Sequence, residues 1–139
     1  MSTCSERSGS GNIATPSVIG SIEYAVEVLG TRLVVVLGHT QCGAVLAALT
    51  DLIRPDESLS PNLQVIVDSI QPAISPLVRP EIQQDEEILM RQAVRENINA
   101  SVRQLRQGSR VLEALIAESG LVVVGAEYSL ETGQVEFFA

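Results

Sequence analysis

Two short runs of apolar, largely β-branched residues constrain the fold of this chain more than any other feature. One extends from Leu33 to Leu37, the other covers residues 121–126, and each follows a segment with helical periodicity. Strands that are apolar on both sides are typical of an α/β sheet whose two faces are buried. Gly30 and Gly120 end the preceding helical patterns, as glycine commonly does after a helix. The pattern therefore predicts parallel strands joined by helices.

The remaining patterns complete an α/β domain. The spacing of apolar residues predicts helices over residues 17–29, 44–53, 62–70, 81–107 and 109–119, and a last strand over 134–138. Only a short turn precedes that strand, so it should pair antiparallel with the one before it. We expect a small, mostly parallel sheet with flanking helices and a C-terminal antiparallel hairpin strand. Residues 1–16, rich in Ser and Gly, are predicted to be a flexible N-terminal segment, and residues 17–139 a single domain.

Composition narrows the classes of function. The 139 residues carry 17 acidic and 9 basic side chains, a formal net charge of −8. This balance argues against nucleic-acid binding, which needs cations to neutralise phosphates. The apolar runs are far shorter than the roughly 20 residues that cross a bilayer, so we expect no membrane partner. The first residues show no signal-peptide pattern, which predicts a cytoplasmic location. Two cysteines do not make a disulfide framework.

The candidate chemistry lies directly after the first apolar run. His39, the only histidine, stands three positions before Cys42, and Cys4 is the only other thiol. Open α/β sheets usually place ligand sites past the carboxyl ends of strands. Zinc favours imidazole and thiolate ligands, and a site with three protein ligands is typical of catalysis. Three other interpretations fit the same residues: His39 caps the following helix, Cys42 is a small buried hydrophobic residue, or the two thiols form a redox disulfide.

The sequence resembles the β-class carbonic anhydrases from Gly11 to its end. The similarity is most specific in the His-x-x-Cys-Gly turn at residues 39–43 and in the strand before it. It extends over residues 11–16, 20–30, 93–97, 102–105, 123–126 and 132–137. The resemblance implies a zinc enzyme that interconverts CO2 and bicarbonate, with Cys4, His39 and Cys42 as the metal ligands. Related enzymes that hydrolyse carbonyl sulfide or carbon disulfide make these molecules alternative substrates.

The family's first zinc ligand belongs to a Cys-x-Asp-x-Arg motif, which this chain matches only in part. Cys4 matches the cysteine, Glu6 stands in place of the aspartate, and Ser8 stands in place of the arginine, with Arg7 one position early. The family's aspartate accepts a hydrogen bond from the zinc-bound water, and its arginine holds that carboxylate. Glu6 and Arg7 are therefore the candidate catalytic residues. The longer side chain of Glu6 displaces its oxygens, so the resemblance implies reduced activity.

The resemblance also implies a sheet that lacks two N-terminal strands found in the family. The strand from Leu33 to Leu37 would then expose an unpaired apolar edge, which monomers avoid. Because family members are dimers or larger assemblies, we expect self-association that covers this edge. The alternative function is a non-catalytic oligomeric scaffold or regulatory binding protein that keeps a vestigial metal site.

Overall fold

The computed structural model describes residues 10–55 and 58–138. The chain order of the described elements is a short 3₁₀ turn, two helix–strand stretches separated by additional helices, and a last strand. Their bounds are η1 (Ser10–Asn12), α1 (Pro16–Glu27), β1 (Leu33–His39), α2 (Gly43–Ile53), α3 (Pro61–Ile74), η2 (Ser75–Leu77), α4 (Glu86–Gln107), α5 (Arg110–Glu118), β2 (Val122–Tyr128) and β3 (Val135–Phe138). The helices and strands expected from the sequence are therefore present, but α4 begins at Glu86, five positions later than expected.

The three described strands form one sheet in the order β1-β2-β3. Strands β1 and β2 are parallel, with Val34 opposite Val123, and β3 runs antiparallel to β2, with Val135 opposite Tyr128. This confirms the predicted α/β class with a C-terminal hairpin. Within the described part of the chain, β1 is an edge strand, as the resemblance implied.

Several helices begin at side chains that satisfy free backbone N–H groups. Ser60, Asp85 and Ser109 each accept a hydrogen bond from the N–H three positions on, at the starts of α3, α4 and α5. Such caps typically stabilise a helix by about 1 kcal/mol. Helix α3 extends further than the sequence predicted, to Ile74. It tolerates Pro72 because this proline lies in its last turn, where only one backbone bond is lost.

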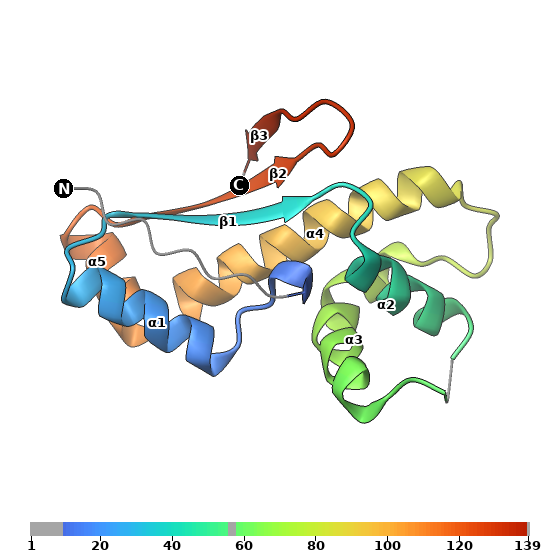
Figure 1. The fold of residues 1–139 in the computed structure, drawn as a ribbon, viewed down its shortest axis with the longest axis horizontal. Helices are drawn as coiled ribbons and strands as arrows, with labels where there is room; N and C mark the ends of the chain where they lie inside the picture. Colours follow the sequence, from blue (N-terminus) through green and yellow to red (C-terminus); the bar gives the residue numbers. More distant parts are fainter. Residues whose placement is uncertain (1–9, 56–57, 139) are drawn as a thin grey trace.

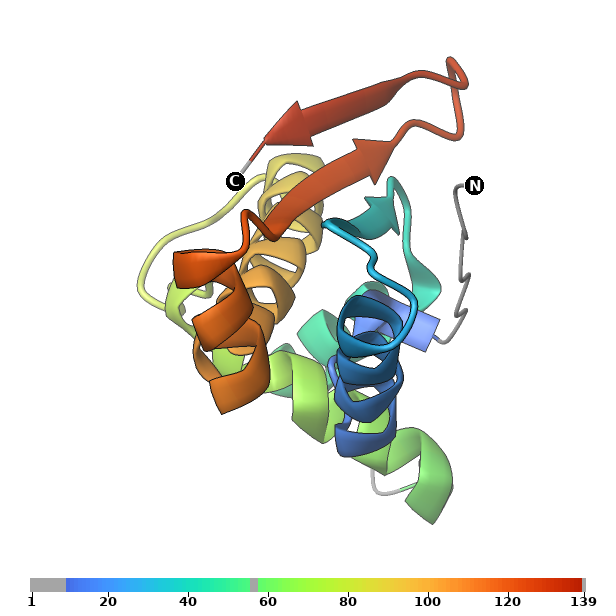
Figure 2. The ribbon, with the colours of Figure 1, turned by 90° about the vertical axis from the view of Figure 1, so that its left-hand side faces the viewer.

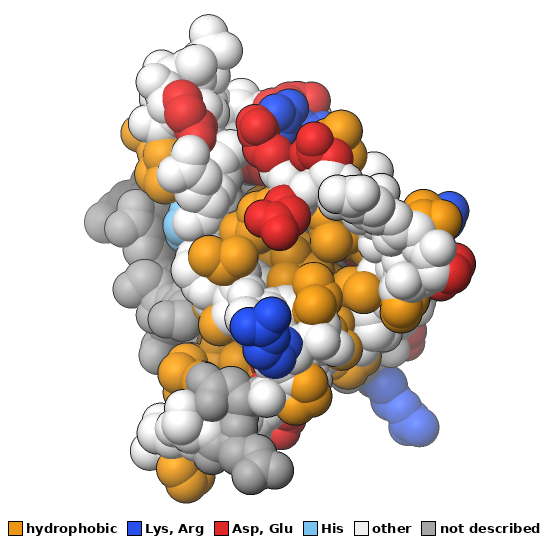
Figure 3. Space-filling view, turned by 90° about the vertical axis from the view of Figure 1, so that its right-hand side faces the viewer, with side chains coloured by type: hydrophobic (Ala, Val, Ile, Leu, Met, Phe, Trp, Pro, Cys, Tyr) orange, Lys and Arg blue, Asp and Glu red, His pale blue; other side chains and the backbone are white. Residues whose placement is uncertain are grey.

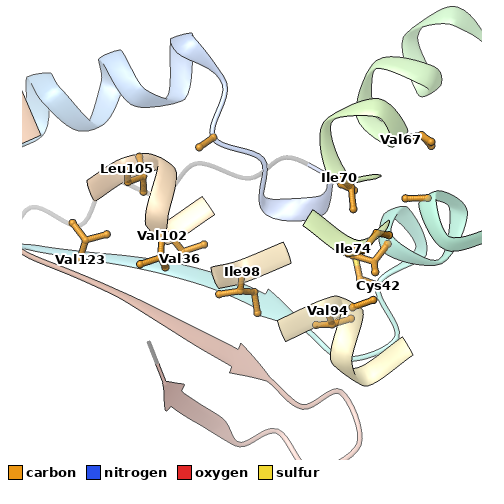
Figure 4. Packing of buried hydrophobic residues seen from close by; sticks show 14 of the residues in the cluster. Val36, Cys42, Val67, Ile70, Ile74, Val94, Ile98, Val102, Leu105 and Val123 are labelled. Carbon is orange, nitrogen blue, oxygen red and sulfur yellow. The ribbon is translucent and has the colours of Figure 1, made fainter. Parts of the chain in front are cut away.

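One face of the sheet packs on α4. The stripe Val94, Ile98, Val102 and Leu105 is buried, as its helical spacing predicts, and shares a core with Val36 and Val123 (Figure 4). We call the sheet face in contact with α4 the covered face. Gly38 approaches α4 so closely that a Cβ atom there would lie 2.5 Å from Ile98 Cδ1.

The opposite face of the sheet carries no described helix. Figures 1 and 2 show the sheet on one side of the molecule and every labelled helix on the other. We call this surface the open face; its exposed apolar side chains are Leu33, Val35, Leu37, Val122, Tyr128, Val135 and Phe137. The prediction that the first apolar run is buried on both sides is therefore wrong for the described structure. Alternate residues of β1 are buried and exposed, because helices cover only one side.

The segment before α1 is held against α4 by bonds to its backbone. Asn97 Nδ2 donates to the Gly11 carbonyl at 2.6 Å, Ser101 Oγ donates to the Asn12 carbonyl at 2.6 Å, and Gln104 Nε2 donates to the Ala14 carbonyl at 2.9 Å. Residues 10–15 of the expected flexible segment thus include a 3₁₀ turn with defined contacts. The first nine residues lie outside the described part, so the prediction for residues 1–16 is not tested as a whole.

Arginines of α4 hold the β2–β3 hairpin: Arg106 donates to the Val123 carbonyl, and Arg95 bonds to both strands. Arg95 bonds to Glu127 at 3.2 Å and to Glu136, and its guanidinium lies 5.0 Å from the centre of the Phe138 ring. These contacts fix where the hairpin stands relative to the end of β1. No described helix is long and apolar enough to cross a bilayer.

Candidate functional site

His39 is the last residue of β1, and its ring has a defined hydrogen-bond partner. Its Nδ1 lies 2.8 Å from the carbonyl oxygen of Thr40. A carbonyl oxygen can only accept, so Nδ1 is the donor of this bond, and the lone pair of a neutral ring is on Nε2. A carbonyl partner on one ring nitrogen is the usual arrangement for a histidine that binds a metal through the other nitrogen. The side chain is exposed on the open face.

Cys42 stands on the opposite side of the turn, at the start of α2. It is 5% exposed and lies in the same core as Ile74 and Val94 (Figure 4). It is the N-cap residue of α2, and its side chain makes no capping hydrogen bond. The interpretation of His39 as the helix cap is therefore wrong. The interpretation of Cys42 as a small buried residue agrees with its burial, and a thiolate at this position still offers zinc a suitable ligand.

Three of the predicted site residues, Cys4, Glu6 and Arg7, lie outside the described residues. Between residues 10 and 138, leaving out 56–57, no group of three His, Cys, Asp or Glu side chains stands ready to hold a metal ion. The structure thus describes two of the three expected zinc ligands, in one turn. The roles of Cys4, Glu6 and Arg7 stay predictions.

The turn between the two ligands is tied to the β2–β3 hairpin. Thr40 N–H donates to the Tyr128 carbonyl at 3.0 Å. Thr40 Oγ1 donates to Glu131 Oε2 at 2.8 Å, and Gln41 Nε2 donates to Glu131 Oε1 at 2.6 Å. Sequence reasoning missed Glu131, because about 90 positions separate the partners. Only the register of β1 beside β2 reveals that the two turns meet.

The hydrogen bonds alter the acidity of Glu131. The bond from Thr40 is the largest cause, with smaller ones from Ser129 and Gln41, and together they hold the pKa of the Glu131 carboxyl below its ordinary value. Hydrogen bonds to a carboxylate favour its charged form. The carboxylate is therefore ionised when it holds the turn at neutral pH.

An open hollow of about 250 Å³ lies beside His39. Its lining residues are Leu37, Gly38, His39, Tyr128 and Leu130. The hollow is at the carboxyl ends of the parallel strands β1 and β2, where α/β sheets usually bind ligands. Its wall is mostly apolar, from Leu37, Tyr128 and Leu130, and it borders the His39 imidazole.

Comparison with known proteins gives consistent matches over most of the chain. A family model described as carbonic anhydrase matches residues 8–135. A carbonic anhydrase of Mycolicibacterium smegmatis is 35% identical over 128 residues, covering 91% of this chain and 58% of that protein. Carbonic anhydrase 2 of Mycobacterium tuberculosis is 33% identical over 126 residues, covering 89% and 57%. The chain thus spans a little over half the length of these curated relatives.

Solved structures agree on the fold. A tetrameric β-carbonic anhydrase from Sordaria macrospora superposes with a TM-score of 0.75 at 23% identity, covering 94% of this chain and 65% of the other. The Coccomyxa β-carbonic anhydrase, in complex with acetazolamide, gives a TM-score of 0.77 at 21% identity, covering 93% and 58%. At these identities the likeness supports the fold alone.

Proposed function

Because this chain belongs to the β-class carbonic anhydrase family, we propose that it catalyses the reversible hydration of CO2 to bicarbonate with a zinc ion. The observation that carries the proposal is the turn after β1. It presents an imidazole whose Nδ1 donates to a backbone carbonyl, so that Nε2 is the nitrogen available to a metal, and, three positions on, a thiol. Both are preferred zinc ligands. Both lie at the carboxyl end of β1, and α/β sheets usually form ligand sites at the carboxyl ends of their strands.

In the proposed site, His39 Nε2 and Cys42 Sγ would hold the zinc together with Cys4. When bound, the metal supplies the acidity that brings the pKa of a water ligand to about 7. The Thr40 carbonyl keeps the proton on Nδ1 of His39 and fixes the ring plane. Leu37 and the neighbouring hollow offer an apolar surface beside His39 against which CO2 could lie.

Glu6 and Arg7 would provide the carboxylate and the cation of the family motif. Glu6 has one more methylene than the aspartate it replaces, and Arg7 is one position early. A misplacement of about 1 Å at a reacting group costs on the order of 100-fold in rate. We therefore propose an enzyme with reduced turnover. The variant Glu6→Asp, which restores the family's residue, should increase its activity.

The test combines zinc analysis with stopped-flow CO2 hydration on the full chain. We expect near-stoichiometric zinc in the reduced protein, loss of zinc and activity in Cys42→Ser and His39→Ala, and a similar loss in Cys4→Ser. Glu118→Ala, an exposed carboxylate on α5, is the matched control and should leave both unchanged. A reduced wild-type chain that binds no zinc would disprove the proposal.

The departures at Glu6 and Ser8 favour a second candidate, a non-catalytic member of the family with a vestigial zinc site. The same experiment separates the two. Stoichiometric zinc without measurable CO2 hydration, and with no gain in Glu6→Asp, supports the vestigial site. Turnover that depends on Cys42 supports the enzyme.

We also propose that copies of this chain associate through the open face and the free edge of β1. The open face groups seven exposed apolar side chains on one side of the sheet. The Arg32 carbonyl and the Thr40 N–H bond to the backbone of β2. Because alternate residues of a strand direct their backbone N–H and C=O groups to opposite sides, those of Leu33, Val35 and Leu37 face the free edge of β1. Unpaired, apolar edges favour association. A relative from Sordaria macrospora is described as tetrameric, which supports the proposal.

Further exposed apolar side chains lie at the end of the molecule where α2 and the start of α4 meet. Leu46, Ile53 and Ile88 are each more than half exposed, and Figure 3 shows hydrophobic side chains gathered in the middle of this end. This second surface would also be covered if the assembly is larger than a dimer. Sedimentation measures the size of the assembly directly.

A further inference from the structure

Gln41, between the two zinc-ligand candidates, has an unfavourable backbone conformation. Its φ is +55°, in the left-handed region, which costs a residue other than glycine roughly 1 kcal/mol or more. Its side chain Nε2 donates to Glu131 Oε1 at 2.6 Å. The hydrogen bond joins the strained residue to a hairpin that is itself anchored on α4, so it offsets part of that cost.

The second carboxylate oxygen of Glu131 holds the neighbouring residue. Thr40 Oγ1 donates to Oε2 at 2.8 Å and accepts from the Leu130 N–H at 3.0 Å. Ser129 Oγ donates to the same Oε2 at 3.0 Å. Both oxygens are therefore engaged, and the two bonds from the turn fix two consecutive residues. Together with the bond from the Thr40 N–H to the Tyr128 carbonyl, these contacts restrict the backbone of the turn.

We propose that Glu131 is a positioning residue that holds Thr40 and Gln41 so that His39 and Cys42, one on each side, are presented to the same metal ion. This inference rests on the proposed zinc function. The two ligands flank the clamped pair directly in sequence, so their separation depends on the backbone angles of Thr40 and Gln41. Among the described residues, the hydrogen bonds of Glu131 go to Thr40, Gln41 and Ser129 and not to either ligand, so it would act on the metal through this turn.

The first test uses the zinc-free chain and does not depend on metal or activity. Backbone amide exchange, followed by NMR at constant pH, reports on the Thr40 N–H, which bonds to Tyr128, and on the Leu130 N–H, which bonds to Thr40 Oγ1. We expect Glu131→Ala to speed exchange at both amides by about tenfold or more, because opening of the turn becomes easier. Glu118→Ala, which removes the same charge elsewhere, should change neither.

The second test measures zinc affinity by competition with a chromophoric chelator. Substitution of a residue that orients metal ligands typically weakens binding by about 10–100-fold, and we expect Glu131→Ala to fall at the lower end. Glu131→Gln keeps the shape and one acceptor oxygen, so it should recover part of the loss. The melting temperature should stay close to the wild-type value, because Glu131 is exposed and outside the core.

A double substitution separates positioning from a general effect of the hairpin. Glycine adopts a positive φ without a steric penalty, so Gln41→Gly removes the strain that Glu131 offsets. In the Gln41→Gly background we expect Glu131→Ala to weaken zinc binding by about threefold or less. An equal loss in both backgrounds would contradict the role assigned to Glu131 at Gln41.

The results also distinguish this inference from the proposed function. A wild-type chain that binds zinc, with Glu131→Ala unchanged in both exchange and affinity, overturns the positioning role and leaves the enzyme proposal standing. A wild-type chain that binds no zinc overturns the enzyme proposal and the link to metal. In that case, faster amide exchange in Glu131→Ala would still support the role of Glu131 in holding the turn, but not a role in metal binding.

Discussion

The two faces of the same sheet differ sharply, although one short strand contributes to both. In β1, Val36 is 8% exposed and packs on α4, whereas the next residue, Leu37, is 51% exposed on the open face. The sequence of the strand is equally apolar on both sides. The difference teaches that helices within the chain complete one face and leave the other for something else to cover. The covered face stabilises the fold, and the open face is where we propose that copies of the chain associate.

The largest effect should come from a cavity on the covered face. Ile98 is fully buried between α4 and the sheet, so Ile98→Ala should cost about 2–5 kcal/mol of unfolding free energy. Leu37→Ala removes a similar side chain from the open face and should cost less than about 1 kcal/mol at concentrations where the chain is monomeric. Urea denaturation at several protein concentrations measures both. Equal losses would show that the open face is also covered within the chain.

A smaller effect is expected from adding volume where the covered face is tightest. In Gly38→Ala the new methyl group would lie 2.5 Å from Ile98 Cδ1 and 3.2 Å from Asn12 Oδ1. Overpacking of this kind typically costs about 1–3 kcal/mol. The control is Gly43→Ala, because no atom lies within 4 Å of a Cβ atom there. Similar denaturation midpoints for the two variants would contradict the close approach of β1 to α4.

A charge on the open face should affect assembly more than folding. Phe137 is 63% exposed in β3, and Phe137→Asp should weaken self-association by about tenfold or more, since a buried carboxylate without a partner is costly. Sedimentation equilibrium measures the dissociation constant. Glu118→Gln is a control for a charge change away from the sheet. An unaltered dissociation constant for Phe137→Asp would place the interface elsewhere.

The smallest effect concerns acidity at the turn. The folded pKa of Glu131 lies below its ordinary value of 4.5, so its bonds contribute fully above that pH and are lost as the pH falls through the folded pKa. We expect an NMR titration of the Glu131 carboxyl to give a midpoint below 4.5, and Thr40→Val to move it upward, because the Thr40 bond is the largest cause. Arg91 is a cationic side chain with a weak influence on the same group. A midpoint unchanged by Thr40→Val would contradict the assigned cause.

The elements of the fold could be predicted from sequence because each has a local signal. The stripe of α4 and the β-branched runs follow periodicities of single elements, and Gly120 ends a helix at a φ of +69°. Which side of the sheet the helices cover could not be predicted, because Val36 and Leu37 are equally apolar. The sequence pattern indicated burial on both faces, and the structure covers one.

The residues of the candidate site also differ in whether the sequence alone could reveal them. His39 and Cys42 could be found because three positions in one turn separate them, and the resemblance added a zinc role. Glu131 gives no local signal, because its partners lie on a different turn and only the register of β1 with β2 brings them together. The positive φ of Gln41 was equally invisible, since glutamine is not a residue that favours this conformation.

The bonds from α4 to the backbone of residues 11–14 have a consequence for Cys4, the proposed third zinc ligand. Gly11 and Asn12 are pinned next to Ala44 and Gly38, which flank the turn that carries His39 and Cys42. Cys4 precedes this anchor by seven positions, a tether with a span of at most about 25 Å. A tether of this length is long enough for Cys4 to reach the turn, as the proposed zinc site requires. Asn97→Ala, which removes the bond to the Gly11 carbonyl, should then weaken zinc binding in a chelator competition by loosening the fixed end of the tether.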